Sequence, residues 1–262
     1  MDPATPRAKP RRGIYLLPNL ITSAALLAGY YAIVSAIGGR YTTAAIAVFV
    51  AGVLDGMDGR IARLTNTQSE FGVQYDSLSD LVSFGLAPAL VMYTWALSTL
   101  GDYGPIMAKV GWAASFLYAA CAALRLARFN AQVGQVDKRF FIGLASPAAA
   151  ALLMSFVWAC REYGLDGRDV ALVALAVTLS GAGLMVSRVR FVSFKGGGPE
   201  SDRVPFLAIL VAILVFVAIA VLRAYALLAI AFGYAASGPL MALFRRRRIE
   251  PVPPAGPAPP AG

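Results

Sequence analysis

Apolar runs of roughly membrane-spanning length follow one another along most of this chain. Charged residues make up only 14% of its 262 residues, whereas a soluble domain carries about a quarter, so they are too few to cover a surface facing water. A helix needs about 20 apolar residues to cross the hydrocarbon core of a bilayer. The sequence therefore predicts a polytopic membrane protein, an all-α bundle of about eight transmembrane helices. The predicted spans are Leu16–Ile37, Thr42–Leu64, Gln74–Leu100, Pro105–Phe129, Ile142–Cys160, Val170–Ser187, Val204–Leu222 and Tyr225–Phe244.

Basic residues divide unequally between the two sides that eight spans define. Of the 23 lysines and arginines, 18 lie in the set of segments that includes both termini, and the other 5 lie in the opposite set. Cytoplasmic loops carry such an excess. The termini and the loop with Arg60 and Arg63 are therefore predicted to be cytoplasmic, in an inner membrane. The net charge of +9 then faces the anionic leaflet and the membrane lipids, and nucleic-acid binding is not needed to explain it.

The two ends of the chain and its rare residues narrow the chemistry. Residues 1–13 are predicted to form a basic cytoplasmic tail, and residues 245–262 a tail that is basic and then disordered. Cys121 and Cys160 are interpreted as small packing residues, because two cysteines in apolar runs cannot build a disulfide framework. Histidine is absent, which leaves acid–base and metal chemistry to carboxylates.

Four aspartates, Asp55, Asp58, Asp76 and Asp80, lie inside or at the edge of predicted membrane helices. A charged residue at the bilayer centre costs at least about 2.5–3.5 kcal/mol, and such residues are usually functional. Alternatively, they lie at the interface or form salt bridges with nearby arginines. Two aspartates on each of two neighbouring helices favour a functional cluster.

Helical spacing places the first two aspartates on one face. Asp55 and Asp58 are three residues apart, and Gly59 and Ala62 continue the same face. The small side chains of Gly59 and Ala62 would let a phosphate-bearing ligand approach the backbone closely. This face of the second span is therefore a candidate binding surface.

The next span repeats acidic positions at steps of one helical turn. Gly72, Asp76 and Asp80 are four residues apart, and Ser79 and Ser83 flank the acids. Because the two spans are antiparallel, all four carboxylates converge near one depth. Such a cluster requires cations, and oxygen ligands suit Mg²⁺, Mn²⁺ or Ca²⁺. Two metals held this way would clamp a phosphoryl group.

The stretch from Asp55 to Asp80 reads D-G-M-D-G-R-I-A-R, eight further residues, then G-V-Q-Y-D-S-L-S-D. It resembles, without a departure, the signature D-x2-D-G-x2-A-R-x8-G-x3-D-x3-D of the CDP-alcohol phosphatidyltransferase family. The resemblance implies a six-helix membrane core, residues 14–203, with a dimetal site open to the cytoplasm. The last two spans, residues 204–244, would be an accessory hairpin. The implied reaction transfers a substituted phosphate from a CDP-linked donor to an alcohol and releases CMP.

The resemblance also implies site residues, cofactors and assembly. The metal-site residues would be Asp55, Asp58, Asp76 and Asp80, with Asp80 also acting as general base. The CDP-binding residues would be Asp55, Asp58, Gly59, Ala62, Arg63 and Gly72. Two Mg²⁺ or Mn²⁺ ions and a homodimer complete the expectation.

Further segments resemble the bacterial CDP-diacylglycerol–serine O-phosphatidyltransferases within this family. They are Leu17–Thr22, Val82–Ala89, Arg125–Asn130 and Phe141–Ala150, the last with Ala145 where proline is usual. The resemblance implies transfer of the phosphatidyl group from CDP-diacylglycerol to L-serine, giving phosphatidylserine and CMP.

A serine acceptor makes its own demand on the sequence, because its carboxylate needs a cation. Arg125 and Arg128 lie three apart on one face at the cytoplasmic end of the fourth span. They are equally interpretable as positive-inside anchors, and Asn130 either binds the serine ammonium group or ends the helix. Together with Ser83, these are the predicted acceptor-binding residues.

Two other functions remain open at the level of sequence. The same chemistry could use glycerol 3-phosphate, an inositol phosphate or choline as the acceptor. A divalent-cation transporter would also need intramembrane carboxylates, but it would not need the glycine, alanine and arginine of the signature. It would also need acids in the outer halves of the helices, where the sequence has none.

Overall fold

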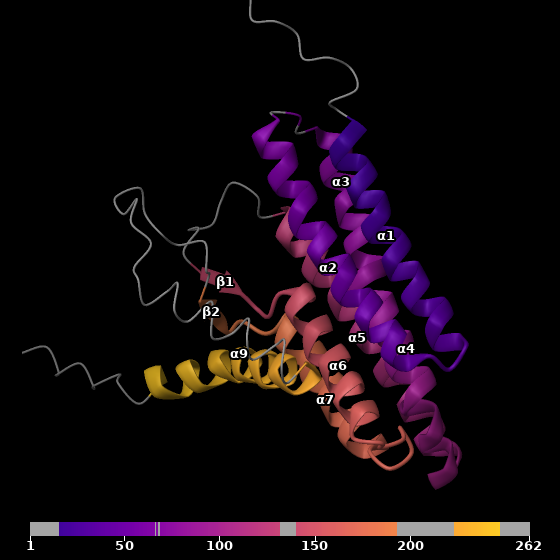
Figure 1. Ribbon diagram of the computed structural model, residues 1–262. Helices are drawn as coiled ribbons and strands as arrows, with labels where there is room; N and C mark the ends of the chain where they lie inside the picture. Colours follow the sequence, from indigo (N-terminus) through magenta and orange to yellow (C-terminus); the bar gives the residue numbers. More distant parts are fainter. Residues whose placement is uncertain (1–15, 66, 68, 132–139, 193–222, 247–262) are drawn as a thin grey trace, which may run out of the picture.

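The structure is a computed structural model that describes residues 16–65, 67, 69–131, 140–192 and 223–246. These residues form a bundle of helices with one short β-ribbon at its side (Figure 1). The helical elements are α1 (Leu16–Ile37), α2 (Tyr41–Leu64), α3 (Glu70–Asp80), η2 (Leu81–Leu86), α4 (Ala87–Trp95), η3 (Leu97–Tyr103), α5 (Pro105–Ala131), α6 (Ser146–Glu162), α7 (Ala171–Val186) and α9 (Ala224–Arg246). The strands are β1 (Phe140–Ile142) and β2 (Arg190–Val192).

The predicted helical class is confirmed. Helix α1 has the predicted bounds, and α2 and α5 differ from theirs by one or two residues at an end. Among the described residues, 4 helices are long and apolar enough to cross a membrane: Leu17–Ile37, Glu70–Tyr103, Pro105–Ala131 and Ala224–Met241. The predicted count of about eight is not established. The predicted span Val204–Leu222, the tail 1–13 and residues 247–262 of the predicted C-terminal tail lie outside the described residues, whereas Arg245 and Arg246 belong to α9.

The third predicted span is one long helical stretch with a change of winding. Helix α3 passes directly into η2, a π-helix, and η2 passes into α4. At this point the backbone N–H of Ala87 bonds to the carbonyl of Val82, five residues earlier. The π-helix follows Asp80 immediately, and π-helical turns occur frequently at functional sites.

Serine hydroxyls attach this stretch to α1. Ser79 Oγ donates to the Thr22 carbonyl at 3.3 Å, and Ser83 Oγ donates to the Ala25 carbonyl at 3.2 Å. A Cβ atom at Gly29 would lie only 2.5 Å from Ser83 Oγ. Close helix contact through small residues is typical of membrane bundles, and it fixes the rotation of the stretch that carries Asp76 and Asp80.

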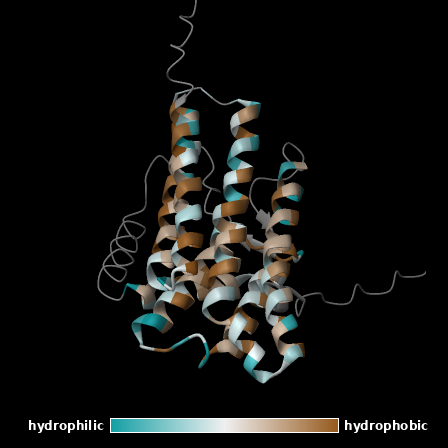
Figure 2. Cartoon of the chain, turned by 90° about the vertical axis from the view of Figure 1, so that its right-hand side faces the viewer, coloured by the Kyte–Doolittle hydropathy of each residue, from teal (hydrophilic) through white to brown (hydrophobic). Residues whose placement is uncertain are grey.

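Small residues occupy many of the buried positions of the bundle, beside larger side chains such as Tyr118 and Phe84. Alanines such as Ala32, Ala44 and Ala51 are fully buried between the helices, whereas Leu27 and Phe116 are exposed. Figure 2 shows hydrophobic residues along the outward faces of the helices. Such an exterior suits a lipid environment, since association in a bilayer depends on close packing.

The β-ribbon was not predicted from the sequence. Strands β1 and β2 are antiparallel, with Phe141 opposite Phe191. Gly143 follows β1 with a φ of +82°, and its N–H bonds to the Val189 carbonyl at 2.8 Å. A side chain at Gly143 would collide with the Met185 carbonyl. The ribbon and this turn direct the chain into α6.

Helix α9 runs crosswise to the other helices of the bundle (Figure 1). It packs against α6 and β2. Since the segment before Arg223 lies outside the described residues, the accessory hairpin of residues 204–244 stays a prediction.

Candidate active site

The reversal between α2 and α3 brings the aspartates together. Helix α2 ends at Leu64, and Thr67 donates its N–H back to the Ala62 carbonyl at 3.0 Å. Ser69 then caps α3 by accepting the N–H of Gly72 at 3.0 Å, as expected of an N-cap serine. Both helices pack against α1, and their acidic faces are directed toward each other.

Three of the four predicted metal ligands form one cluster. Each of Asp55, Asp76 and Asp80 offers a carboxylate oxygen, and these oxygens lie within 4.8 Å of one another. All three residues are half-buried. Carboxylates this close repel one another strongly in a poorly solvated site, so the arrangement requires a compensating cation or proton.

Asp58 lies beside this cluster and has a different environment. Its side chain is buried, and its Oδ2 accepts a hydrogen bond of 2.6 Å from the hydroxyl of Thr22 on α1. The charges of Asp55 and Asp76 act on it. The structure therefore places Asp58 next to the three-oxygen cluster, with one of its oxygens already engaged by α1.

The donor set fits a divalent metal ion. Asp76 Oδ1 is buried and has no hydrogen-bond partner among the described residues. A buried carboxylate oxygen without a donor is costly, and a metal ion would satisfy it. Oxygen-only ligands are those that Mg²⁺ and Mn²⁺ prefer. Asp55, Asp76 and Asp80, with Asp58 adjacent, are therefore suited to hold such an ion.

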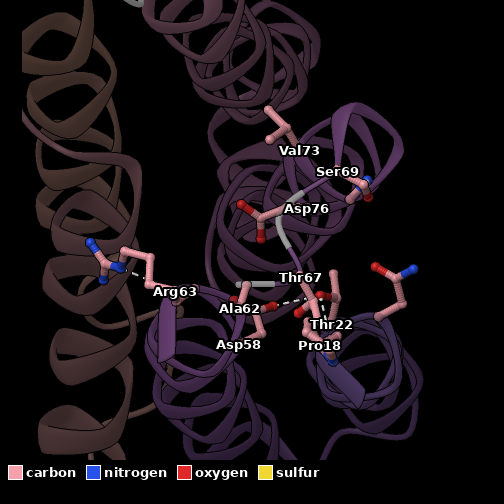
Figure 3. A pocket seen from close by; sticks show the side chains of 12 residues that line it. Pro18, Thr22, Asp58, Ala62, Arg63, Thr67, Ser69, Val73 and Asp76 are labelled. Carbon is pink, nitrogen blue, oxygen red and sulfur yellow. Dashed lines mark hydrogen bonds between the residues drawn. The ribbon is translucent and has the colours of Figure 1, made fainter. Parts of the chain in front are cut away.

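A cavity of about 330 Å³ opens between α1, α2 and α3 at this site. Figure 3 shows Asp58 and Asp76 facing it from α2 and α3. Its lining residues are Pro18, Asn19, Thr22, Asp58, Gly59, Ala62, Arg63, Thr67, Ser69, Gly72, Val73 and Asp76. Of the residues predicted to bind CDP, all but Asp55 line this cavity. Their role in nucleotide binding stays a prediction.

Sequence reasoning missed the contribution of α1 and of the connecting loop to the cavity. Pro18, Asn19 and Thr22 line it from α1, and Thr67 and Ser69 from the loop. The α1 residues belong to the segment Leu17–Thr22, which resembles the bacterial serine O-phosphatidyltransferases but was not predicted to line the site. The sequence did contain a signal for this contribution, because Asn19 and Thr22 are polar residues three positions apart near the start of an apolar helix.

Arg63 takes an unexpected direction. Its Nε donates to the carbonyl of Gly59 on its own helix at 3.0 Å. The guanidinium extends away from Asp58 and Asp76 (Figure 3). A Cβ atom at Gly59 would meet nothing within 4 Å. The cavity wall at Gly59 is therefore open, and the binding of a ligand phosphate by Arg63 stays a prediction.

Among the predicted acceptor-binding residues, Arg125 interacts electrostatically with Asp80 of the carboxylate cluster. Its Nη1 donates to Ser146 Oγ at 3.1 Å, and the charges of Asp80 and Arg128 act on it. Asn130 Nδ2 instead donates to Ser77 Oγ at 3.0 Å, and the Ser83 hydroxyl faces α1. Asn130 and Ser83 thus join helices in this state, and their role toward an acceptor stays a prediction.

Comparisons with known proteins agree with this geometry. The profile of the CDP-alcohol phosphatidyltransferase family matches residues 15–242. A Helicobacter pylori (strain ATCC 700392 / 26695) protein named CDP-diacylglycerol--serine O-phosphatidyltransferase is 38% identical over 187 residues, which cover 71% of this chain and 76% of the relative.

Two relatives from other lineages are similar over comparable lengths. A Mycobacterium leprae protein of the same name is 33% identical over 230 residues, or 85% of this chain and 73% of that protein. An archaetidylserine synthase of Methanothermobacter thermautotrophicus is 33% identical over 187 residues, or 71% and 73%. The resemblance inferred from the signature is confirmed, and the chain belongs to the CDP-alcohol phosphatidyltransferase family.

Proposed function

We propose that this enzyme transfers the phosphatidyl group of CDP-diacylglycerol to the hydroxyl of L-serine, giving phosphatidylserine and CMP. The observation that carries the proposal is the cluster of Asp55, Asp76 and Asp80 beside the cavity between α1, α2 and α3. The names of the H. pylori and M. leprae relatives support serine as the acceptor.

The donor would bind with its nucleotide in the cavity and its acyl chains in the membrane. Gly59, Ala62 and Gly72 leave room for the diphosphate close to the backbone, and Arg63 is positioned to pair with it. The basic bias of the predicted cytoplasmic segments supports an inner-membrane enzyme whose active site faces the cytoplasm. CDP-diacylglycerol would then enter from the inner leaflet while its CDP group stays in the water.

The acidic residues divide the chemical work. Two Mg²⁺ or Mn²⁺ ions would be held by Asp55, Asp58, Asp76 and Asp80. The ions would neutralise negative charge on the phosphoryl group during its transfer. Asp80 also accepts the proton of the serine hydroxyl as the serine oxygen forms its bond to phosphorus. The bond from phosphorus to the CMP oxygen breaks, and Asp80 later releases the proton to water. A carboxylate fills this role because the chain has no histidine.

Arg125 would bind the carboxylate of serine. It lies on α5 within electrostatic range of Asp80, so a serine held by its carboxylate would have its hydroxyl near the proposed base. Arg128 lies one turn further on the same helix and would add positive potential. Replacing either arginine by alanine should raise the KM for serine more than the KM for the donor.

The proposal extends to assembly. As the resemblance to the family implies, we expect residues 14–203 to form the six-helix core and residues 204–244 to form the hairpin. We also expect two copies of the chain to form a homodimer through their core helices. Cross-linking in detergent should capture a dimer, and a uniformly monomeric protein would contradict this expectation.

An acceptor screen tests the function. Purified full-length protein would receive CDP-diacylglycerol, Mn²⁺ or Mg²⁺, and either serine, glycerol 3-phosphate, an inositol phosphate or choline. We expect CMP release and phosphatidylserine formation with serine alone. Turnover with another acceptor and none with serine would overturn the serine assignment and leave the family membership intact.

A further inference from the structure

Pro88 lies at the point where the stretch from α3 to α4 would otherwise continue as one α-helix. Proline has no backbone N–H, and inside an α-helix its ring collides with the carbonyl four residues earlier, which here is that of Phe84. The chain winds differently here, because the Ala87 N–H bonds to the Val82 carbonyl five residues earlier and Pro88 falls in the first turn of α4. Proline is tolerated in a first turn, so η2 accommodates Pro88.

The Phe84 carbonyl accepts a hydrogen bond from another helix. Tyr118 of α5 donates its hydroxyl proton to this carbonyl at 3.2 Å. Tyr118 is fully buried, and a Cβ atom at Gly181 of α7 would lie 3.3 Å from its ring, so the ring is closely packed. A buried carbonyl that loses its donor is costly. The phenol therefore supplies the donor that Pro88 lacks.

Helix α5 approaches η2 closely enough for this bond because Gly85 faces it. A Cβ atom at Gly85 would lie 3.2 Å from the Cβ atom of Ala122, one turn beyond Tyr118 on α5. A second hydroxyl of α5, that of Ser115, donates to the Ala89 carbonyl of α4 at 2.8 Å. The bond of Tyr118 is made within the π-helix, whereas the bond of Ser115 is made beyond it.

The winding of η2 determines the rotation of the acidic residues that precede it. Asp80 comes directly before η2, one turn before Phe84, and Asp76 lies one turn before Asp80. In α-helical winding, the same residues would hold both acids at a different rotation relative to α4. The carboxylates would then be turned away from Asp55, with which they form the cluster. The cluster therefore depends on the winding of η2.

We propose that Tyr118 is a positioning residue of the metal site. Its bond to the Phe84 carbonyl stabilises the π-helical winding of η2. That winding keeps Asp76 and Asp80 directed toward Asp55. The inference rests on the proposed metal-dependent transfer and deepens it. Among the described residues, neither the cavity lining nor the carboxylate cluster includes Tyr118, so the tyrosine acts on the metal through the backbone of η2.

The experiment measures Mn²⁺ binding to purified full-length protein in detergent, from the EPR signal of free Mn²⁺, together with the apparent melting temperature. Tyr118→Phe keeps the ring and removes the donor, so the winding that aligns the acids should be less populated. The dissociation constant for Mn²⁺ should rise by about tenfold or more. Ser115→Ala is the matched control, because it removes a buried hydroxyl donor to α4 from the same helix. It should bind Mn²⁺ like wild type.

A second substitution separates the winding from general stability. Pro88→Ala restores a backbone N–H and removes the ring, so that ordinary α-helical bonding can satisfy the Phe84 carbonyl. Combined with Tyr118→Phe, it should return the melting temperature to about that of wild type. Mn²⁺ binding should stay weak, because the acids remain rotated away. A tyrosine that contributed only stability would show both properties recovering together.

Each outcome decides the inference. Equal Mn²⁺ binding by Tyr118→Phe and wild type overturns it, as does recovery of Mn²⁺ binding in the double variant or an equal loss in Ser115→Ala. If Tyr118→Phe does not fold, the double variant, whose Phe84 carbonyl has a donor, provides the same comparison. These results leave serine transfer intact. A wild-type protein that binds no Mn²⁺ overturns the proposed metal site, and this inference with it.

Discussion

Thr22 donates its hydroxyl proton to Asp58 Oδ2 across the α1–α2 interface at 2.6 Å. Both side chains are buried, and each belongs to a different predicted membrane span. The bond orients one carboxylate of the acidic site from a helix that contributes no acid. Outer partners of this kind orient ligands, and their loss typically lowers metal affinity or activity by about 10–100-fold.

Replacing Thr22 by valine should therefore weaken activation by metal. Valine keeps the shape and leaves Asp58 Oδ2 without its donor, so the Mn²⁺ concentration for half-maximal activity should rise by about tenfold or more. Thr178→Val is the matched control, since Thr178 is fully buried on α7 and its hydroxyl donates to the Ala174 carbonyl of its own helix at 2.7 Å. Identical Mn²⁺ titrations for Thr22→Val and wild type would contradict a role in orienting Asp58.

A methyl group at Gly59 should obstruct the donor and leave the fold intact. The added Cβ would meet no protein atom within 4 Å, yet Gly59 lines the cavity. We expect Gly59→Ala to melt like wild type and to raise the KM for CDP-diacylglycerol by tenfold or more. Gly56→Ala provides the control, because Gly56 is equally open on α2 and does not line the cavity. Equal kinetics for the two variants would remove Gly59 from the donor site.

Asp80→Asn separates a base from a ligand. The amide keeps the shape of the side chain and removes its basicity, so turnover should fall by about 10²–10⁴-fold, the usual contribution of a general base. Donor KM and metal activation should change little. Since Asp80 lies in the same cluster as Asp55 and Asp76, a collapse of metal activation together with turnover would identify it as a ligand first.

Removal of metal should abolish activity reversibly. A chelator leaves Asp55, Asp76 and Asp80 mutually repulsive, and added Mg²⁺ or Mn²⁺ should restore turnover. Asp76→Ala removes the carboxylate with the buried oxygen that has no donor among the described residues and should not be restored at any metal concentration. Activity that survives thorough chelation would contradict a metal-dependent site.

Ala145→Pro should stabilise the protein. Ala145 precedes α6 with φ −63° and ψ 138°, values that proline adopts without strain. Such a replacement restricts the unfolded chain and adds about 0.4–1 kcal/mol of stability. The apparent melting temperature in detergent should rise, whereas Ala150→Pro, in the interior of α6, should lower it sharply. A lower melting temperature for Ala145→Pro would show that its N–H has a partner.

Apolar length and four aspartates were enough to predict most of the helices and the place of the acidic site. Helix α1 was predictable to the residue because its apolar run stops at Gly38 and Gly39. Helical spacing alone predicted that Asp55 would meet Asp76 and Asp80. These residues lie on two helices that follow each other in the sequence and are joined by a short loop, so the regular geometry of neighbouring segments was sufficient for this prediction.

Relations between distant segments were out of reach of the sequence. The bond from Thr22 to Asp58 joins residues 36 apart, and the bond from Arg125 to Ser146 joins residues 21 apart on α5 and α6. The π-helix η2 was equally hidden, because Leu81–Leu86 is apolar throughout and its hydropathy does not change with the winding. The β-ribbon depends on pairing of two three-residue strands, too short for a periodic signal.

The winding of η2 makes the length of this segment matter as much as its composition. An α-helix turns by about 100° per residue, and a stretch with bonds to the fifth residue holds one residue more than the α-helix would. Deleting one residue between 81 and 86 would therefore let ordinary α-helical bonding resume and leave Asp76 and Asp80 at nearly the same rotation relative to α4. The same deletion inside α4 would instead turn the helix beyond it by about 100°, so η2 holds a spare residue that its neighbour lacks.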